Sequence, residues 1–128
     1  MDEVSASRTA LAASLMRAVH TRCDPVRILD DPWGDRFITS SALQALEQFA
    51  ASSREGAAGD AEAGDLQTTV DAIMRTNPGY ANVVLRGRYT EDALEQALSA
   101  GISQYVLIGA GFDSYALRRS AAAAALEI

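Results

Sequence analysis

Apolar residues at helical spacing dominate the first part of the chain. Leu11, Leu15 and Val19 recur four residues apart, which places them on one face of a helix predicted over residues 7–20. Two Asp-Pro pairs follow and end the helix, because the residue before a proline is pushed out of the helical region. A short turn of structure is expected just beyond them, over residues 33–38.

Capping residues and turn chemistry predict three further helices. A capping-box signature at 41–44 begins the first, and apolar spacing favours the second over 66–74, with Asn-Pro-Gly at 77–79 ending it. Thr90 is placed to cap the third, and Gly101 to end it in the left-handed conformation. The chain thus opens as a set of short helices.

Two segments carry no regular apolar pattern. Residues 51–65 consist of Ala, Gly, Ser and acidic residues with no large apolar side chain, so nothing there offsets the entropy of ordering and a mobile loop is predicted. Residues 80–89 are ambiguous between helix and strand. The total of 128 residues fits one domain with one core.

The pattern changes near the end of the chain. Residues 104–108, Gln-Tyr-Val-Leu-Ile, form a nearly continuous apolar run, which is typical of a strand covered on both faces in a parallel sheet. A Gly-Ala-Gly turn follows at 109–111, then a helix that Asp113 or Ser114 can cap. Residues 126–128 resemble the beginning of a second strand, so the pattern predicts an α/β fold.

Composition and charge narrow the possible partners. The net charge of −6, with no block of Lys or Arg, argues against nucleic acid. Cys23 is the single cysteine, so no intrachain disulfide can form, and no Cys/His spacing suggests a metal site. Neither a signal peptide nor an apolar stretch of about 20 residues is present, so no membrane partner and a cytoplasmic location are expected.

The turn at 109–111 is the segment that suggests chemistry. Glycine lacks the Cβ that would block a ligand from the backbone amides, and it tolerates positive φ. A dinucleotide fingerprint would need a third glycine where Ser114 stands. The carboxylate of Asp113 would repel a pyrophosphate but could accept a hydrogen bond from an ammonium or hydroxyl group. The turn therefore suits a cationic adenosine ligand without phosphates better than NAD or FAD.

Several segments together resemble a known family. The stretch at 86–94 reads Arg-Gly-Arg-Tyr-Thr-Glu-Asp-Ala-Leu, and the turn at 109–111 lies within Val-Leu-Ile-Gly-Ala-Gly-Phe-Asp-Ser-Tyr-Ala-Leu-Arg. With Ser-Arg-Thr-Ala-Leu at 7–11 and Asp-Asp-Pro at 30–32, they resemble leucine carboxyl methyltransferase-like proteins, a family that includes many actinobacterial S-adenosylmethionine-dependent methyltransferases.

The resemblance implies a cofactor, S-adenosyl-L-methionine, and residues that hold it. The glycine turn would line the cofactor, and Asp113 would shape that turn. Arg86 matches the arginine that pairs with the methionine carboxylate, a bidentate contact that lysine would not reproduce. Arg17 aligns with a second basic residue near the same carboxylate. The predicted cofactor-binding residues are therefore Arg17, Arg86, Gly109, Ala110, Gly111 and Asp113.

The resemblance also implies the fold and the activity. Within the single domain 1–128, residues 1–79 would form an N-terminal helical cap, and 80–128 the first cofactor-binding β-α unit with the start of a second strand. This would be the beginning of a Rossmann-like class I methyltransferase sheet. The implied reaction is methyl transfer to an oxygen, possibly a carboxylate, of a small-molecule or other carboxylate-bearing acceptor.

The chain also departs from the family. Family members continue through the rest of the sheet, and the catalytic residues would lie beyond Ile128. The sequence is therefore interpreted as a truncated member with impaired or no activity alone. Two alternatives stay open, a non-catalytic remnant or interaction module and a fragment of an NAD- or FAD-dependent oxidoreductase.

Other residues have structural interpretations that are preferred over functional ones. The side chains of Arg118 and Arg119 are expected near a helix C-terminus, where they favour the dipole. His20 is expected as a helix-end residue rather than a general base, and Tyr115 as a buried ring rather than a platform for adenine. Glu127 precedes the position of the family's ribose-binding acid, so that role is not assigned to it.

Overall fold

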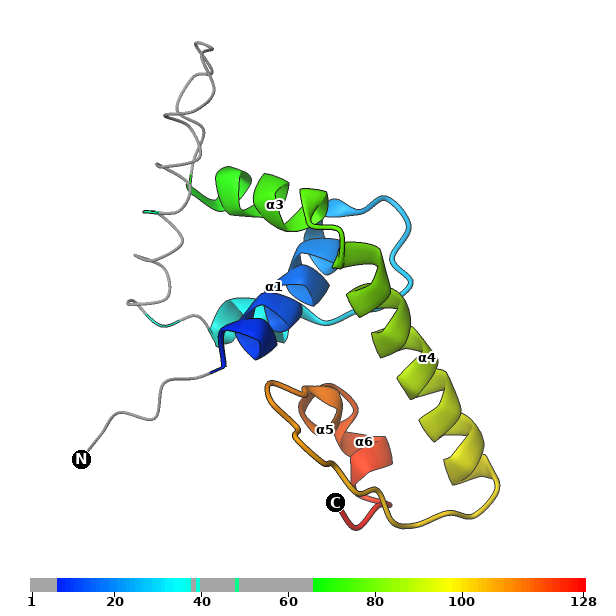
Figure 1. The fold of residues 1–128 in the computed structure, drawn as a ribbon. Helices are drawn as coiled ribbons and strands as arrows, with labels where there is room; N and C mark the ends of the chain where they lie inside the picture. Colours follow the sequence, from blue (N-terminus) through cyan, green and yellow to red (C-terminus); the bar gives the residue numbers. More distant parts are fainter. Residues whose placement is uncertain (1–6, 38, 40–47, 49–65) are drawn as a thin grey trace, which may run out of the picture.

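The computed structural model describes residues 7–37, 39, 48 and 66–128, and these form a small helical assembly (Figure 1). The predicted helix at 41–50 and the predicted mobile loop at 51–65 lie outside the described residues, apart from position 48. The helical elements are α1 (Arg8–Cys23), the 3-10 helix η1 (Pro32–Arg36), α3 (Leu66–Thr76), α4 (Tyr80–Ser99), α5 (Tyr115–Arg118) and α6 (Ser120–Ala123).

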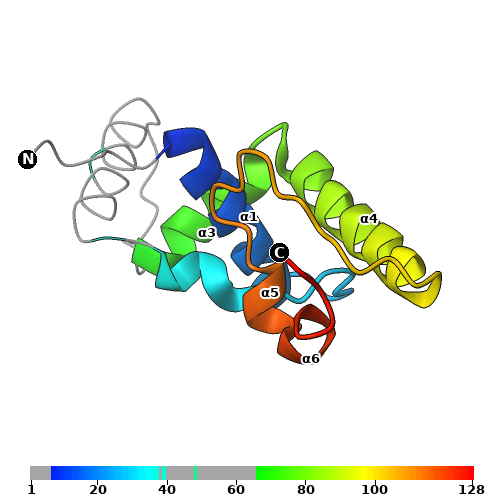
Figure 2. The same cartoon turned by 90° about the horizontal axis from the view of Figure 1, so that it is seen from below.

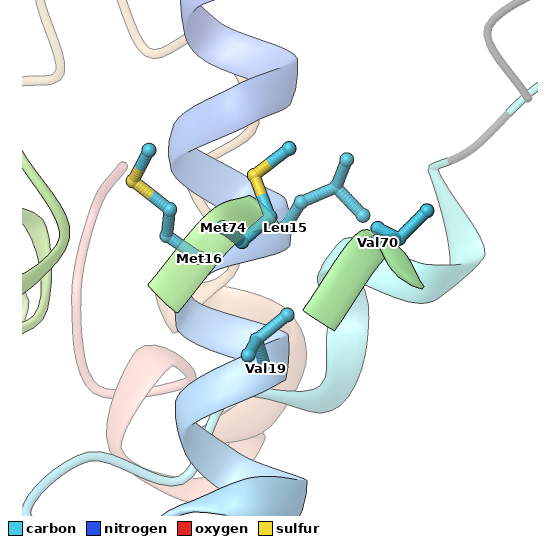
Figure 3. Packing of buried hydrophobic residues seen from close by; sticks show 5 residues of the cluster. All are labelled: Leu15, Met16, Val19, Val70 and Met74. Atoms are coloured by element: carbon cyan, nitrogen blue, oxygen red, sulfur yellow. The ribbon is translucent and has the colours of Figure 1, made fainter. Parts of the chain in front are cut away.

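Helix α1 is the centre of the packing and confirms the helix that apolar spacing predicted, although polar residues of α1 such as Ser14, His20 and Thr21 are buried along with its apolar ones. Its first turn is capped by the Ser7 hydroxyl, which accepts a hydrogen bond from the Ala10 amide at 3.4 Å. Its apolar face packs against α3 in a core cluster that Figure 3 shows at close range. The cluster consists of Leu15, Met16, Val19, Val70 and Met74.

The short helix η1 lies tightly against α1, and a glycine makes this approach possible. A Cβ built on Gly34 would stand 2.1 Å from the backbone oxygen of Ser14, far inside contact distance. The prediction of structured chain just after the Asp-Pro pairs is confirmed, because η1 begins at Pro32 and Asp31 caps it through the Trp33 amide.

Helix α4 corrects one of the sequence predictions. Residues 80–89, which were ambiguous, form its first half, and Thr90 lies in its interior rather than at an N-cap. The helix begins after the predicted turn at 77–79, and the Thr90 hydroxyl donates to the Arg86 carbonyl at 2.9 Å, which lets threonine stay inside the helix.

The predicted end of this helix is confirmed. Gly101 adopts φ +86°, a conformation that favours glycine. Its amide donates to the Leu98 carbonyl, and the Ile102 amide donates to the Ala97 carbonyl, both at 3.0 Å. This pair of bonds is a Schellman motif, which satisfies carbonyls that the helix leaves open.

The predicted sheet start is not formed in the described residues. Gln104 and Glu127 make an isolated parallel bridge, supported by a bond from the Tyr105 amide to the Glu127 carbonyl at 2.9 Å. The described part of the chain contains no strand longer than this bridge, because no described element covers the apolar run at 104–108 that was expected to be buried. Val106 is 77% exposed and Ile108 is 94% exposed.

The chain after α4 folds back toward α1. Both views show the segment from residue 101 to 114 returning from the far end of α4, with α5 and α6 following it (Figures 1 and 2). The turn at 109–111 therefore comes close to the N-terminal half of α1, where a Cβ on Gly111 would stand 3.2 Å from the Cβ of Ala10.

Candidate functional site

The Gly-Ala-Gly turn has the backbone geometry that its sequence predicted. Gly109 has φ +67° and Gly111 has φ +55°, both in the left-handed region that other residues rarely adopt. No atom would lie within 4 Å of a Cβ on Gly109, so the turn is open on that side. The two glycines are needed for conformation, and Gly111 is needed also for its approach to α1.

Asp113 fixes the exit from this turn. Its amide donates to the Ala110 carbonyl at 3.0 Å, and its Oδ1 accepts a hydrogen bond from the Tyr115 amide at 3.0 Å. The Asp113 side chain therefore satisfies the first free amide of α5, while the N-cap residue itself is Ser114, whose side chain makes no capping hydrogen bond. Asp113 shapes the turn through the backbone that follows.

A cavity of about 460 Å³ lies between α1, α4 and the segment around the glycine turn. Its size is within the range of about 300–1,000 Å³ that is usual for small-molecule sites. The cavity brings together side chains that are far apart in the sequence, from both helices and the turn. Every predicted cofactor-binding residue is among its lining residues: Arg17, Arg86, Gly109, Ala110, Gly111 and Asp113.

Arg86 differs from the other arginines of the cavity in its contacts. It projects from α4 as an exposed residue, and its guanidinium makes no ion pair or hydrogen bond with any residue that the structure describes. A guanidinium without a carboxylate beside it keeps its donors for a ligand, and its fork geometry matches a carboxylate.

Arg17, in contrast, is engaged within the protein. Its Nε donates to Asp31 Oδ2 at 2.7 Å, and its Nη2 donates to the Phe112 carbonyl at 2.7 Å. The second bond joins α1 to the residue directly after the glycine turn. Arg17 therefore holds the turn in place as well as lining the cavity.

Asp31 is the most important residue that the sequence interpretation did not select. Its side chain is completely buried, and its Oδ2 accepts a second hydrogen bond, from the Ser114 hydroxyl at 2.6 Å. Its Oδ1 lies 3.4 Å from Arg118 Nε. A buried carboxylate needs hydrogen bonds and ion pairs of this kind to offset its loss of water. Here these contacts link α1 to both ends of α5. The Asp-Asp-Pro match at 30–32 was the available sequence signal.

Arg118 extends the network to α4. Arg118 lies at the end of α5, as expected, but its side chain also forms hydrogen bonds and ion pairs with other residues and does not only favour the helix dipole. Nη1 donates to the Asp30 carbonyl at 2.9 Å, Nε to the Ser114 hydroxyl at 2.9 Å, and Nη2 pairs with Glu91. Glu91, only 3% exposed, is thus a buried carboxylate of the cavity wall.

The comparison with protein families decides the family question. Residues 10–128 match the model of the leucine carboxyl methyltransferase family. The chain belongs to this family. No curated protein and no solved structure matches the chain significantly.

Membership supports methyltransferase as the general activity, and the family generally uses S-adenosylmethionine. In the described part of this methyltransferase, no group of three or more His, Cys, Asp or Glu side chains is arranged to hold a metal ion. None of the described helices has the length and apolar character to cross a membrane.

The remaining residues that the sequence singled out have structural roles. His20 is buried near the end of α1, and its Nε2 accepts from the Ile28 amide at 3.1 Å. The proton is therefore on Nδ1, which donates to Asp24 at 2.7 Å, so both ring nitrogens are occupied. Glu127 accepts a hydrogen bond from the Gln104 amide group at 3.0 Å.

Proposed function

We propose that the cavity binds S-adenosyl-L-methionine and that the protein takes part in methyl transfer to an oxygen of an acceptor. The observation that carries this proposal is the unpartnered guanidinium of Arg86 in the same cavity as the glycine turn. A charged donor that is unpaired in the described residues, beside a turn with open backbone, suits a ligand with a carboxylate at one end.

The described residues fit this cofactor in charge as well as in size. Arg17 and Arg118 are both neutralised by buried carboxylates, Asp31 for the first and Glu91 for the second. Among the arginines that line the cavity, Arg86 is therefore the one whose charge is not balanced by a carboxylate of the described residues. The open side of Gly109 leaves room for the adenosine part against the backbone.

The protein's contribution to the reaction would be alignment. When bound, S-adenosylmethionine supplies a methyl group on a positively charged sulfur. The bound cofactor would supply that methyl group to an acceptor oxygen and would keep the electron pair of the broken C–S bond as a neutral thioether. Arg86 and the glycine turn would hold the cofactor, and Arg17 would keep the turn in place, so that donor and acceptor are aligned. We further propose a carboxylate-bearing acceptor, and a Rossmann-like sheet that continues from the Gln104–Glu127 bridge.

The test is calorimetric titration of the full chain with S-adenosylhomocysteine, compared with NADH. The proposal expects binding of the first ligand and none of the second. Arg86→Gln should weaken binding about tenfold to a hundredfold, the usual worth of a hydrogen bond to a charged group. Arg86→Lys should restore only part of the affinity, because it keeps the charge and loses the fork.

Arg27→Gln is the matched control. Arg27 is an exposed arginine that does not line the cavity, so this variant loses the same charge and should bind like the unaltered chain. Absence of S-adenosylhomocysteine binding, or equal affinity of the Arg86→Gln and unaltered chains, would refute the proposal. Binding of NADH alone would support the oxidoreductase alternative.

A further inference from the structure

Two buried polar atoms in the cavity wall have no hydrogen-bond partner among the described residues. They are the hydroxyl oxygen of Tyr115 and Oε2 of Glu91, and each of these side chains is 3% exposed. Nearly all buried polar atoms in native proteins are paired, so two orphans in one wall need an explanation. A ligand in the cavity that both residues line would provide one.

The Tyr115 side chain is held in place, so its hydroxyl cannot easily find another partner. The Tyr115 amide is fixed by Asp113 Oδ1, and the ring meets Tyr105 edge to face, with centroids 6.1 Å apart. The predicted burial of this ring is confirmed. The sequence did not predict a buried hydroxyl with no partner among the described residues.

The carboxylate of Glu91 has one oxygen engaged and one without a hydrogen bond to any described residue. Oε1 pairs with Arg118, whereas the guanidinium nitrogens ion-paired with Oε2 lie 3.6 Å away on Arg119 and 3.8 Å away on Arg88, too far for a good hydrogen bond. Burial raises the pKa of Tyr105, and the nearby Asp113, Tyr115 and Glu91 raise it further. A group that donates hydrogen bonds is therefore complementary to this wall.

We infer that the Tyr115 hydroxyl, together with Glu91 Oε2, receives the ammonium group at the amino-acid end of the bound ligand. This inference rests on the proposed function. An ammonium has three donors and a positive charge, which matches two oxygen acceptors in one wall. Arg86 lines the same cavity and suits the carboxylate of that same amino-acid end. The cavity would thus recognise a zwitterion with separate groups for its two charges.

The experiment combines a protein change with a ligand change. Tyr115→Phe keeps the ring and removes only the hydroxyl, and affinities are measured for S-adenosylhomocysteine and for its analogue with hydrogen in place of the amine. We expect about a tenfold loss of affinity for S-adenosylhomocysteine in the variant. We expect no loss for the analogue, because it lacks the donor that the hydroxyl receives.

The thermal midpoint without ligand gives a second, independent measurement. Because the Tyr115 hydroxyl has no partner in the part of the chain that the structure describes, its removal should leave the midpoint unchanged or raise it. The matched control is Tyr80→Phe, since the Tyr80 hydroxyl lies outside the cavity and donates to Asp24 Oδ2 at 2.8 Å. That variant should have a lower midpoint and unaltered affinity for both ligands.

The outcomes separate this inference from the proposed function. If the unaltered chain binds S-adenosylhomocysteine and Arg86→Gln weakens it, but Tyr115→Phe has no effect or weakens both ligands equally, the inference is wrong and the proposed function stands. A lower midpoint for ligand-free Tyr115→Phe would also contradict it, because it would indicate a structural partner. Failure of the unaltered chain to bind S-adenosylhomocysteine overturns both.

Discussion

Asp31→Asn should be strongly destabilising, although the two side chains have almost the same shape. The carboxylate is fully buried and faces donors on both oxygens: Oδ2 accepts from Arg17 Nε and the Ser114 hydroxyl, while Oδ1 accepts from the Trp33 amide. In either orientation of the asparagine side chain, its NH2 group would face a hydrogen-bond donor, at a position where the carboxylate had an acceptor oxygen.

The expected cost follows from burial and charge. Removing one member of a buried ion pair costs about 3–5 kcal/mol, because the partner keeps its charge in a poorly solvated place. The side chains of Arg17 and Arg118 are 17% and 10% exposed, so water relieves part of that penalty. We expect a loss of about 3 kcal/mol in the free energy of unfolding, or roughly 12 °C in the thermal midpoint for a chain of this size.

Urea unfolding at pH 7, followed by far-UV circular dichroism, measures this loss. The control is Asp71→Asn, because Asp71 pairs with Arg22 at 2.5 Å but the two side chains are 16% and 26% exposed. The control should cost about 1 kcal/mol. If Asp31→Asn lowers the free energy of unfolding by no more than Asp71→Asn does, the ion pairs and hydrogen bonds of the Asp31 carboxylate are not what holds α1 against the glycine turn.

Two further predictions concern close packing and acid. Gly34→Ala should cost about 3 kcal/mol, because the new Cβ would overlap the Ser14 carbonyl; Gly79→Ala, where the nearest atom is a side-chain oxygen at 3.2 Å, should cost far less in the same urea assay. Burial raises the pKa of Asp71, but hydrogen bonds from Arg22 and other groups outweigh it, and the net pKa is lowered from 3.8. A lowered pKa means that the stabilisation is complete above 3.8 and is lost as pH falls through the folded-state value. The urea midpoint should therefore fall less between pH 5 and pH 2 in Asp71→Asn than in the unaltered chain, and an equal fall would contradict the assignment.

The sequence determined the local elements whose causes are local. The spacing of Leu11, Leu15 and Val19 was enough to predict α1. The turn at 77–79 and the left-handed Gly101 were likewise predicted, because turn and cap geometries depend on the residues that form them. The length of α4 was not, since Thr90 serves equally as a cap or as an interior residue.

The strand at 104–108 shows where this kind of prediction stops. An apolar run favours a buried strand only if other strands and helices cover it. The described residues provide one parallel bridge, at Gln104, and leave Ile108 exposed. The residues of this run are compatible with a buried strand and with an exposed segment. The elements that pack around the run therefore decide which of the two forms.

The sequence also predicted six cofactor-binding residues, through the glycine turn and the family resemblance, and all six line the cavity. Only the tertiary structure divided their roles. Among the described residues, it left the Arg86 guanidinium without a partner, engaged Arg17 with Asp31, and buried the Tyr115 hydroxyl without a hydrogen bond. Turn geometry and capping are set by neighbours in the chain, whereas the state of a charge or a hydroxyl depends on groups that folding brings from distant segments. For that reason the motif could be identified from the sequence, whereas only the folded structure distinguished Arg17, which is engaged with Asp31, from Arg86, whose guanidinium has no partner among the described residues.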